Sequence, residues 1–376
     1  MKTLANPIVR FFFLSLLISF QTQAAPLTRP LPNWVDETRE TKHTLSVTDF
    51  RYTPPPVNPF VVPPEYAPMK AVAMGWAGYS QLLTQIAIAV STAGNAEVWM
   101  AGGPSALPNV SADKYHTIAC PVDSVWMRDY GPFGFSSLTD RSQDFARLDN
   151  QLGIIDTRYR HEAYRINDDR LPTCLAELNG AERVAPNFIL DGGNFMIDSA
   201  GSVFMTRRVL NWNQHLTESQ VTQTVKAYFG AKQVHLLEYA GYPGSPADGT
   251  GHIDMFAKLL DDETVAIATS VVEPFKSNGE NAIRYFSSLT TPSGRPYQIV
   301  ELRSAYNGQT WFTYTNSLIV NHALLLPTYQ NYKNLNDEAI KTLSSRTSYQ
   351  VIGINSDVSI GAGGAIHCVT QQIPQQ

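Results

Sequence analysis

The stretch QLLTQIAIAVSTAGNAEVWMAGG (81–103) joins a helix-forming segment to a strand-forming one. Apolar side chains in residues 81–94 follow a helical period, and residues 96–103 form the short apolar run typical of a buried strand. The same helix-then-strand order recurs at 170–187, 217–241, 280–304 and 337–357. Repeats in a fixed order indicate supersecondary units that can close into a ring, so an α/β ring of five units is expected.

A polar, glycine-containing segment follows each unit: WMRDYGPFGF (126–135), LDGGNFMID (190–198), GTGHIDMFAKLL (249–260), YTNSLIVN (314–321) and GGAIHCVTQ (363–371). Their residues Asp129, Gly193, His252, Asn316 and Cys368 recur at intervals of 52 to 64 positions. Because equivalent loops of a ring converge near its axis, we expect the five segments to line one cavity. The alternative is a single α/β sheet whose loops happen to be polar.

The N-terminus has the layout of a secretory signal peptide over residues 1–24. Lys2 and Arg10 precede an apolar run at 11–20, small residues follow, and cleavage after Ala24 avoids leaving Pro26 at the new N-terminus. The run is shorter than the roughly 20 residues that a membrane span needs. A secreted or periplasmic protein is therefore expected.

The rest of the chain divides into a leader and a body. Residues 25–68 are rich in proline, which disfavours helix and indicates an extended leader on the surface of a domain. Residues 69–376 are expected to form the catalytic domain. The net charge of −5 argues against nucleic acid or an anionic membrane as partner, because both call for a basic face.

The three cysteines leave two arrangements open. Cys120 and Cys174 can pair, which leaves Cys368 as the free thiol, or all three are buried and reduced. As a nucleophile, Cys368 would need a lowered pKa, which neighbouring donors, positive charge or a cationic substrate can supply. Glycines 361, 363 and 364 before it suit close approach of a ligand. The competing interpretation is an inert buried thiol.

Other segments offer acid, base and binding groups. If GHID is a strand, His252 and Asp254 point to the same face and can place an acid/base and a carboxylate in one pocket; alternatively, His252 is structural. Asp129 adds a second carboxylate and Trp126 a flat apolar wall. Further polar groups come from Asp191, Asn194 and Asn316. Two carboxylates beside a thiol suit a guanidinium, whose nitrogens donate in a fork and whose face stacks on aromatic rings.

The five segments resemble the signatures of the agmatine deiminase and bacterial-type peptidylarginine deiminase family, within the guanidine-modifying superfamily. The resemblance runs from about residue 60 to the C-terminus and implies a five-bladed α/β propeller of ββαβ units. It implies that Cys368 is the nucleophile, that His252 is the acid/base and that Asn316 lies near the thiol. Asp129 and Asp254 would hold the guanidinium nitrogens. It implies no metal and no organic cofactor.

The substrate is less defined. Agmatine deiminases usually carry a glutamate before the paired glycines and a WGG stretch, whereas this chain has Asp191 and GIIDTRYRHEAYRINDDRLP (153–172). It therefore looks more similar to exported peptidylarginine deiminases, with Arg160 and Arg165 as candidates to hold a C-terminal carboxylate. Arg158 is an alternative in register, Arg128 a further substrate-binding candidate, and a solvated basic loop the competing interpretation.

The expected activity is conversion of peptidyl or free arginine to citrulline and ammonia. An alternative is an agmatine deiminase that forms N-carbamoylputrescine; another is a non-catalytic ring that binds a cationic ligand. A papain-like protease would need a CGSCW-type helix start and Cys before His, and neither occurs. A metal site from His252, Asp254 and His367 is a further alternative, in which Cys368 would compete as a soft ligand.

Overall fold

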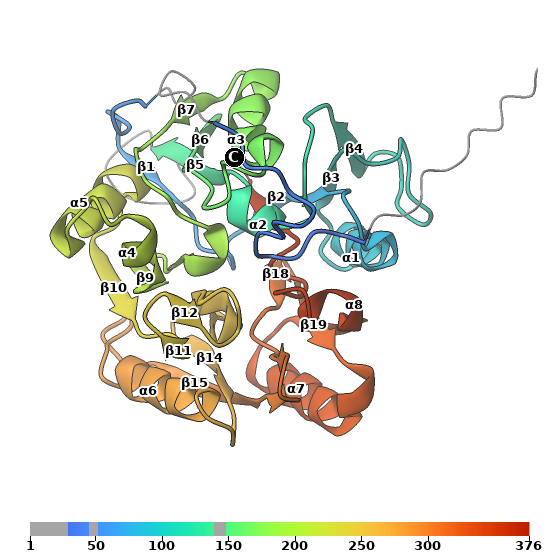
Figure 1. Cartoon of the computed structure of the whole chain (residues 1–376), viewed down its shortest axis with the longest axis vertical. Coiled ribbons are helices and arrows are strands. Elements are labelled where there is room, and N and C mark those ends of the chain that lie inside the picture. Colours follow the sequence, from blue (N-terminus) through green and yellow to red (C-terminus); the bar gives the residue numbers. More distant parts are fainter. Residues whose placement is uncertain (1–28, 45–51, 139–147, 376) are drawn as a thin grey trace, which may run out of the picture.

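The computed structural model describes residues 29–44, 52–138 and 148–375. The predicted signal peptide (1–24) lies outside these residues. Five of the described sheets share one pattern: two antiparallel strands, then a helix, then a third strand parallel to the second. The chain is thus a mixed α/β protein, and its sheets and helices lie around a common centre (Figure 1).

The first of these sheets combines the two ends of the body. Its strands are β2 (Met69–Gly75), β3 (Glu97–Ala101), β4 (Tyr115–Ile118) and the C-terminal β21 (Gln371–Pro374), and the helix α1 (Ser80–Thr92) joins β2 to β3. β2 pairs antiparallel with β21 and parallel with β3. The strands of the next sheet are β1 (Phe60–Val61), β5 (Phe133–Leu138), β6 (Leu148–Ile155) and β7 (Glu182–Val184), and the helix α3 (Ile166–Asn179) lies between β6 and β7 in the chain.

The other three sheets follow along the chain. One has the strands β8 (Met196–Ile197), β9 (Ser202–Thr206) and β10 (Gln233–Leu237), with the helices α4 (Arg208–Trp212) and α5 (Glu218–Phe229) between β9 and β10. Another has the strands β13 (Ala257–Leu259), β14 (Thr264–Thr269) and β15 (Gln298–Arg303), with the helix α6 (Phe275–Ser287) between β14 and β15. The last has the strands β18 (Leu318–Val320), β19 (Ala323–Thr328) and β20 (Gln350–Asn355), with the helix α7 (Lys333–Arg346) between β19 and β20.

Short elements complete the fold. Two hairpins are formed by β11 (Gly241–Tyr242) with β12 (Ser245–Pro246), and by β16 (Ala305–Tyr306) with β17 (Trp311–Phe312). The short helical turns are α2 (Met127–Tyr130), η3 (Gly192–Asn194), η4 (Ile253–Met255), η5 (Gln330–Tyr332) and α8 (Asp357–Ile360).

Local sequence accounts for the repeated units. On α5, Val221, Val225 and Phe229 are buried at four-residue spacing, and Thr217 and Gln220 form a capping box at its start. β2 buries residues 71–74 completely, as expected of a strand covered on both faces. All five predicted helix-then-strand pairs are confirmed. The second helix begins at Ile166, earlier than predicted, and contains Pro172.

The condition on which His252 and Asp254 were expected to share one face of a sheet is not met. GHID is not a strand: residues 253–255 form the single turn η4, and His252 precedes it in an extended conformation. The carboxylate of Asp248 accepts hydrogen bonds from the backbone amides of Thr250 and Gly251, at 3.0 and 2.7 Å. Gly251 has φ +72°. This local turn takes up the amides that a strand would use for pairing.

Cys120 and Cys174 form a disulfide, and Cys368 is free and buried. The first of the two arrangements left open by the sequence is therefore the correct one. None of the helices in the described ranges is long and apolar enough to cross a membrane.

Residues 29–44, called the strap below, contain no helix or strand among the described residues. The strap crosses the centre of the molecule beside α2 (Figure 1). The prediction of an extended leader on the surface is incomplete, because Asn33 is fully buried.

Candidate active site

The thiol of Cys368 lies in a buried network with Asn316 and Asp254. The Asn316 carboxamide donates from Nδ2 to Cys368 Sγ at 3.1 Å and to Asp254 Oδ2 at 2.9 Å. Cys368 Sγ is itself 3.5 Å from Asp254 Oδ2. Asn316 Oδ1 accepts from the backbone amides of Ala365 and Cys368. Asn316 thereby fixes the turn that carries the thiol.

The glycines before Cys368 make room for neighbours in this chain. A Cβ at Gly364 would lie 2.4 Å from Cys368 Sγ and 3.0 Å from the ring of Trp126, so the predicted aromatic wall does lie near the thiol. A Cβ at Gly363, which has φ +109°, would lie 2.7 Å from the Cβ of Asn33. Gly361 is not crowded in this way.

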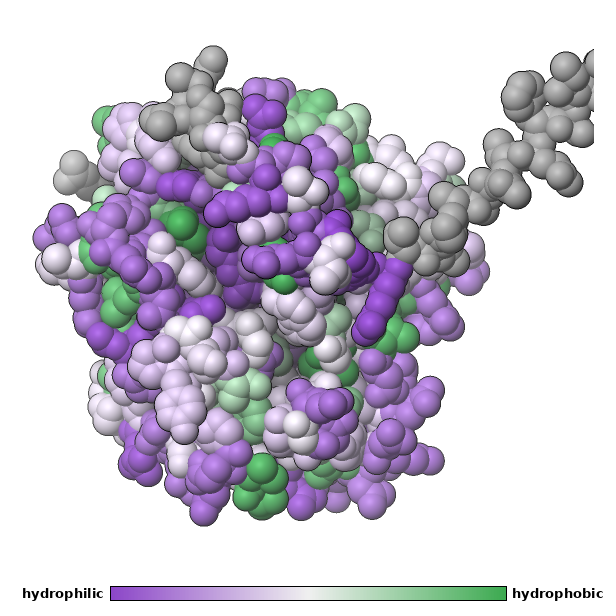
Figure 2. Space-filling model, in the orientation of Figure 1, coloured by the Kyte–Doolittle hydropathy of each residue, from purple (hydrophilic) through white to green (hydrophobic). Residues whose placement is uncertain are grey.

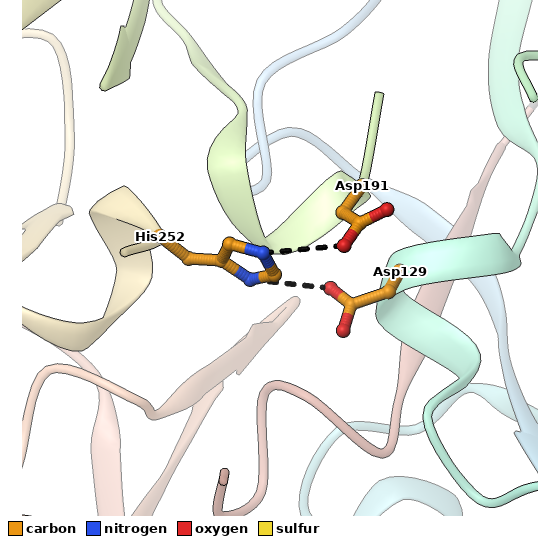
Figure 3. A group of neighbouring side chains, drawn as sticks. All are labelled: Asp129, Asp191 and His252. Carbon is orange, nitrogen blue, oxygen red and sulfur yellow. Dashed lines mark ion pairs between the residues drawn. The ribbon is translucent and has the colours of Figure 1, made fainter. Parts of the chain in front are cut away.

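His252 lies between two carboxylates (Figure 3). Its Nδ1 is 3.5 Å from Asp129 Oδ1, and its Nε2 is 3.3 Å from Asp191 Oδ2. Asp129 comes from α2, Asp191 precedes η3 and His252 precedes η4. Three short turns, distant in sequence, thus bring one imidazole and two carboxylates together. Asp191 was predicted to bind substrate, but in the structure it contacts the imidazole.

Gly193 lies where these groups meet. Its amide donates to Asp129 Oδ1 at 3.1 Å. A Cβ on Gly193 would lie 2.5 Å from His252 Nδ1, 2.8 Å from Asp129 Oδ1 and 3.1 Å from Asp254 Oδ2. Only glycine fits, which places His252, Asp129 and Asp254 around one point.

Arg160 reaches the centre from the loop between β6 and α3. Its Nε is 2.9 Å from Asp191 Oδ2, and its Nη1 is 3.2 Å from His252 Nε2. Its Nη2 donates to the backbone carbonyl and the side-chain Oδ1 of Asn33. Asn33 Nδ2 donates to Asp129 Oδ2 at 2.9 Å.

A second layer supports Asp254. His367 Nδ1 is 2.7 Å from Asp254 Oδ2, and His367 Nε2 is 2.5 Å from Glu65 Oε1. Glu65 also pairs with Lys258 and Arg128. Buried charges of both signs are thus matched behind the carboxylate of Asp254.

The surroundings shift the pKa values of the three central groups. Burial and the charges of Asp254 and Asp129 raise the pKa of the Cys368 thiol well above its ordinary value. Burial opposes protonation of His252, but Asp129 and Asp191 outweigh it and raise the pKa of the imidazole. Burial also opposes ionisation of Asp254, but His367 outweighs it and lowers the pKa of that carboxyl. The free site therefore favours a thiol, an imidazolium and a carboxylate.

Three residues predicted to bind substrate are occupied elsewhere. Asn194 exchanges two hydrogen bonds with the backbone of Thr206. Arg128 points to Glu65 and Gln372, and Arg165 is bound to the strap. Each of these polar groups already has partners within the fold. The register alternative, Arg158, pairs with Glu162.

Several residues of the site escaped prediction. Asn33 lies in the proline-rich leader, where no motif distinguishes it. Trp212 packs edge-on against His252 at 5.7 Å between ring centroids, and the guanidinium carbons of Arg160 and Arg208 each lie 5.8 Å from its ring. Glu65 follows two prolines, and the sequence suggests His367 only as a metal ligand. A lone acid in an apolar stretch (61–67) was the one available signal for Glu65.

Asp129, Asp191 and His252 are also close enough to share a metal ion. The set differs from the alternative drawn from the sequence, which named His252, Asp254 and His367. Arg160 already brings a positive charge to Asp191 and to His252 Nε2. The guanidinium of Arg160 thus already supplies the positive charge that a metal ion would bring to these three side chains. They therefore fit a metal ion poorly.

Sequence comparison places this arrangement among known proteins. The profile of the Porphyromonas-type peptidyl-arginine deiminase family matches residues 61–374. An agmatine deiminase of Medicago truncatula is 26% identical over 373 residues, covering 85% of this chain and 98% of the relative.

Solved structures agree in fold. A structure from Porphyromonas gingivalis has a TM-score of 0.72 at 24% identity and covers 84% of this chain and 98% of its own. The agmatine deiminase of Enterococcus faecalis has a TM-score of 0.70 at 19% identity, covering 86% of this chain and 100% of its own. On the strength of the sequence profile, this chain belongs to the Porphyromonas-type peptidyl-arginine deiminase family.

Proposed function

We propose that this protein hydrolyses the guanidinium group of a small guanidine compound to a ureido group and ammonia, with agmatine as the first candidate. The observation that carries this proposal is the convergence of Cys368, His252, Asp129 and Asp254 on one buried point. Membership of a deiminase family supports the reaction type.

Asp254 offers the clearest place for a guanidinium. Its Oδ1 is buried and has no hydrogen-bond partner among the residues that the structure describes. Buried carboxylate oxygens are normally satisfied, so an unpaired one beside a thiol fits a donor brought by a ligand. A guanidinium would supply that donor and would span towards Asp129 with its other nitrogens.

In the proposed reaction, the Cys368 thiol releases its proton to water once the guanidinium is bound, and the resulting thiolate attacks the guanidinium carbon and forms a C–S bond. His252 donates its proton to one nitrogen, the C–N bond breaks and ammonia leaves. The neutral imidazole then takes a proton from water, whose oxygen attacks the same carbon. The C–S bond breaks, the remaining hydroxyl proton of the intermediate passes to the sulfur, the ureido product leaves and the thiol is restored. No oxidant or reductant is required.

The raised pKa of the thiol gives the substrate a part in its own activation. The carboxylates of Asp254 and Asp129 disfavour a thiolate. A guanidinium bound between them would offset their charge and lower the thiol pKa. Attack would then begin only when the cationic substrate is in place.

Agmatine is the first candidate because relatives similar over most of the chain are agmatine deiminases. A buried centre also suits a small molecule: Cys368 and His252 are 0% exposed. This ranking replaces the sequence-based preference for peptidyl arginine.

The second candidate is arginine, free or at a peptide C-terminus. The presence of Arg160 and Arg208 around Trp212 favours it, because these cations suit a carboxylate better than the amine of agmatine. An exported location would also fit a peptide substrate. Support for export comes from the signal-peptide pattern and from the Cys120–Cys174 disulfide, since disulfides persist in oxidising compartments.

We also propose that the five similar sheets form a closed five-bladed ring with the site on its axis. The order ββαβ in each unit supports it, as does the pairing of the C-terminal β21 with β2, which joins the two ends of the body.

The test is a substrate comparison with the purified protein. Agmatine, arginine, a short peptide ending in arginine and the same peptide with a C-terminal amide are incubated separately, and ammonia and ureido product are measured. The highest kcat/KM for agmatine supports the first candidate. Preference for the free-carboxylate peptide over its amide promotes the second. Absence of product from all four overturns the proposed function.

A further inference from the structure

The strap brings a residue into the catalytic centre from outside the region that matches the family. The family profile begins at residue 61, whereas Asn33 lies in the strap and is 0% exposed. The centre of this protein therefore contains a group that the family match does not account for.

The Asn33 carboxamide bridges two groups to which substrate recognition has been assigned above. Its Nδ2 donates to Asp129 Oδ2 at 2.9 Å, and its Oδ1 accepts from Arg160 Nη2 at 2.6 Å. A carboxylate only accepts and a guanidinium only donates, so the two ends of the carboxamide cannot be exchanged. Asn33 thus presents an N–H donor to Asp129, as a guanidinium would, and an oxygen to Arg160, as a carboxylate would.

The backbone of the strap is held at the same place. The Asn33 amide donates to the carbonyl of Ala362 at 2.7 Å, and Trp126 Nε1 donates to the carbonyl of Leu31 at 2.9 Å. Gly363 leaves the space that the Asn33 side chain occupies. The strap therefore contacts both the turn before the thiol and the aromatic wall beside it.

A buried ion pair anchors the strap at a distance from the thiol. Arg165 is fully buried; its Nε donates to Glu40 Oε1 at 2.6 Å, and its Nη2 donates to the carbonyls of Pro32 and Trp34, both at 2.8 Å. Loss of one partner of a buried pair leaves an uncompensated charge, so this contact controls how firmly the strap is docked.

With the strap docked, the catalytic groups are closed to solvent. Cys368 and His252 are 0% exposed, and Asp129 and Asp254 are 1% exposed. Hydrophilic side chains gather on the face that the strap crosses, which suits a segment able to leave that face for water (Figure 2). A substrate nitrogen that donates to Asp129 Oδ2 would meet the Asn33 carboxamide at that oxygen.

We propose that the strap is a substrate-mimicking gate, in which Asn33 competes with the guanidinium substrate for Asp129 and undocks when substrate binds. The inference rests on the proposed function in one respect, that Asp129 receives the substrate. The neutral carboxamide makes weaker hydrogen bonds to a carboxylate than a cationic guanidinium does, so a true substrate displaces it. Weak binders do not, and Asn33 thereby determines specificity.

Two variants weaken the gate by different routes. Asn33→Ala removes the contacts with Asp129 and Arg160 and leaves the anchor intact. Glu40→Gln weakens the anchor and leaves the catalytic centre untouched. Glu37→Gln, an exposed side chain of the same strap, is the matched control. Circular dichroism and thermal melting establish that each variant is folded.

The first measurement does not depend on turnover. Cys368 is the free thiol and the other two cysteines are paired, so alkylation by iodoacetamide reports access to the centre. The alkylation rates of the variants are compared at the high-pH plateau, where the thiol is fully ionised. Differences between them then report access to the thiol and not its pKa. Both gate variants are expected to react at least about tenfold faster than wild type and Glu37→Gln, because a larger fraction of molecules is open. Unchanged or slower labelling of folded Asn33→Ala overturns the gate.

The second measurement is steady-state turnover of the best guanidine substrate. The gate predicts a KM lowered several-fold in both variants, because Asn33 is absent from one and less firmly docked in the other. In Glu40→Gln, which leaves the catalytic centre untouched, kcat should stay similar to wild type. A raised KM in Asn33→Ala would mean that Asn33 binds substrate instead, and would overturn the gate. If wild type releases no product from any guanidine while labelling still accelerates, the proposed function fails and the gate stands.

Discussion

The carboxamide of Asn316 donates a 3.1 Å hydrogen bond to the thiol of Cys368, while its oxygen accepts from the amide of the same cysteine. One side chain therefore fixes both the sulfur and the backbone that carries it. Since Asn316 also donates to Asp254, the nucleophile and the carboxylate are positioned by one group.

Asn316→Ala is expected to lower kcat by about 10²-fold, because the thiolate loses a positioned donor. The free energy of unfolding should fall by about 1–3 kcal/mol, since buried backbone amides lose their acceptor. Turnover and denaturant unfolding measure the two effects. Asn334→Ala, on the exposed side of α7, is the control and should change neither. Wild-type kcat in Asn316→Ala would remove Asn316 from the reaction.

The free thiol is expected to react slowly with alkylating reagents below its ordinary pKa of about 8.5. Burial and the charges of Asp254 and Asp129 raise the thiol pKa, so the thiolate should form only at higher pH. The labelling rate is measured against pH in wild type and in Asp129→Asn. Loss of one negative charge should move the midpoint to lower pH. A wild-type plateau reached near neutral pH would contradict this account of the site.

Asp191→Asn is expected to lower the pKa of His252, because one of the two carboxylates that favour the imidazolium is removed. His252 must be protonated to release ammonia, so activity should decline as pH rises through its pKa. The alkaline limb of the kcat profile should therefore move to lower pH in the variant. An unmoved limb would mean that another group supplies the proton.

Replacement of both disulfide cysteines, Cys120→Ser with Cys174→Ser, is expected to lower the free energy of unfolding by about 2–4 kcal/mol, because the bond closes a long loop of the unfolded chain. The two cysteines are 54 positions apart. Activity should persist in the folded variant, since the bond lies outside the catalytic network. Denaturant unfolding with and without reductant, together with turnover, tests both statements.

The sequence predicted what depends on local periodicity. The five helix-then-strand units were recognisable because apolar spacing reports burial on each element. The convergence of Asp129, Gly193, His252, Asn316 and Cys368 followed from their equivalent places in those units. Asp254 was expected beside His252 only if GHID were a strand, and the structure has a turn there.

Other features depend on tertiary contacts that no local pattern encodes. Asn33 enters the centre because Arg165, far along the chain, binds Glu40 and the strap carbonyls. Arg165 and Arg160 looked alike in the sequence, yet one anchors the strap and the other contacts His252. Asn194 resembled a binding residue, but the backbone of Thr206 satisfies it.

The central claim, covalent catalysis by Cys368, is tested most directly by mass spectrometry of protein quenched during turnover of agmatine or arginine. We predict an adduct on the peptide that contains Cys368, with the mass of the substrate less one ammonia. The adduct should be absent from a folded Cys368→Ala variant, which should also release no ureido product. Undiminished turnover by Cys368→Ala, or an adduct on a different residue, would contradict the claim.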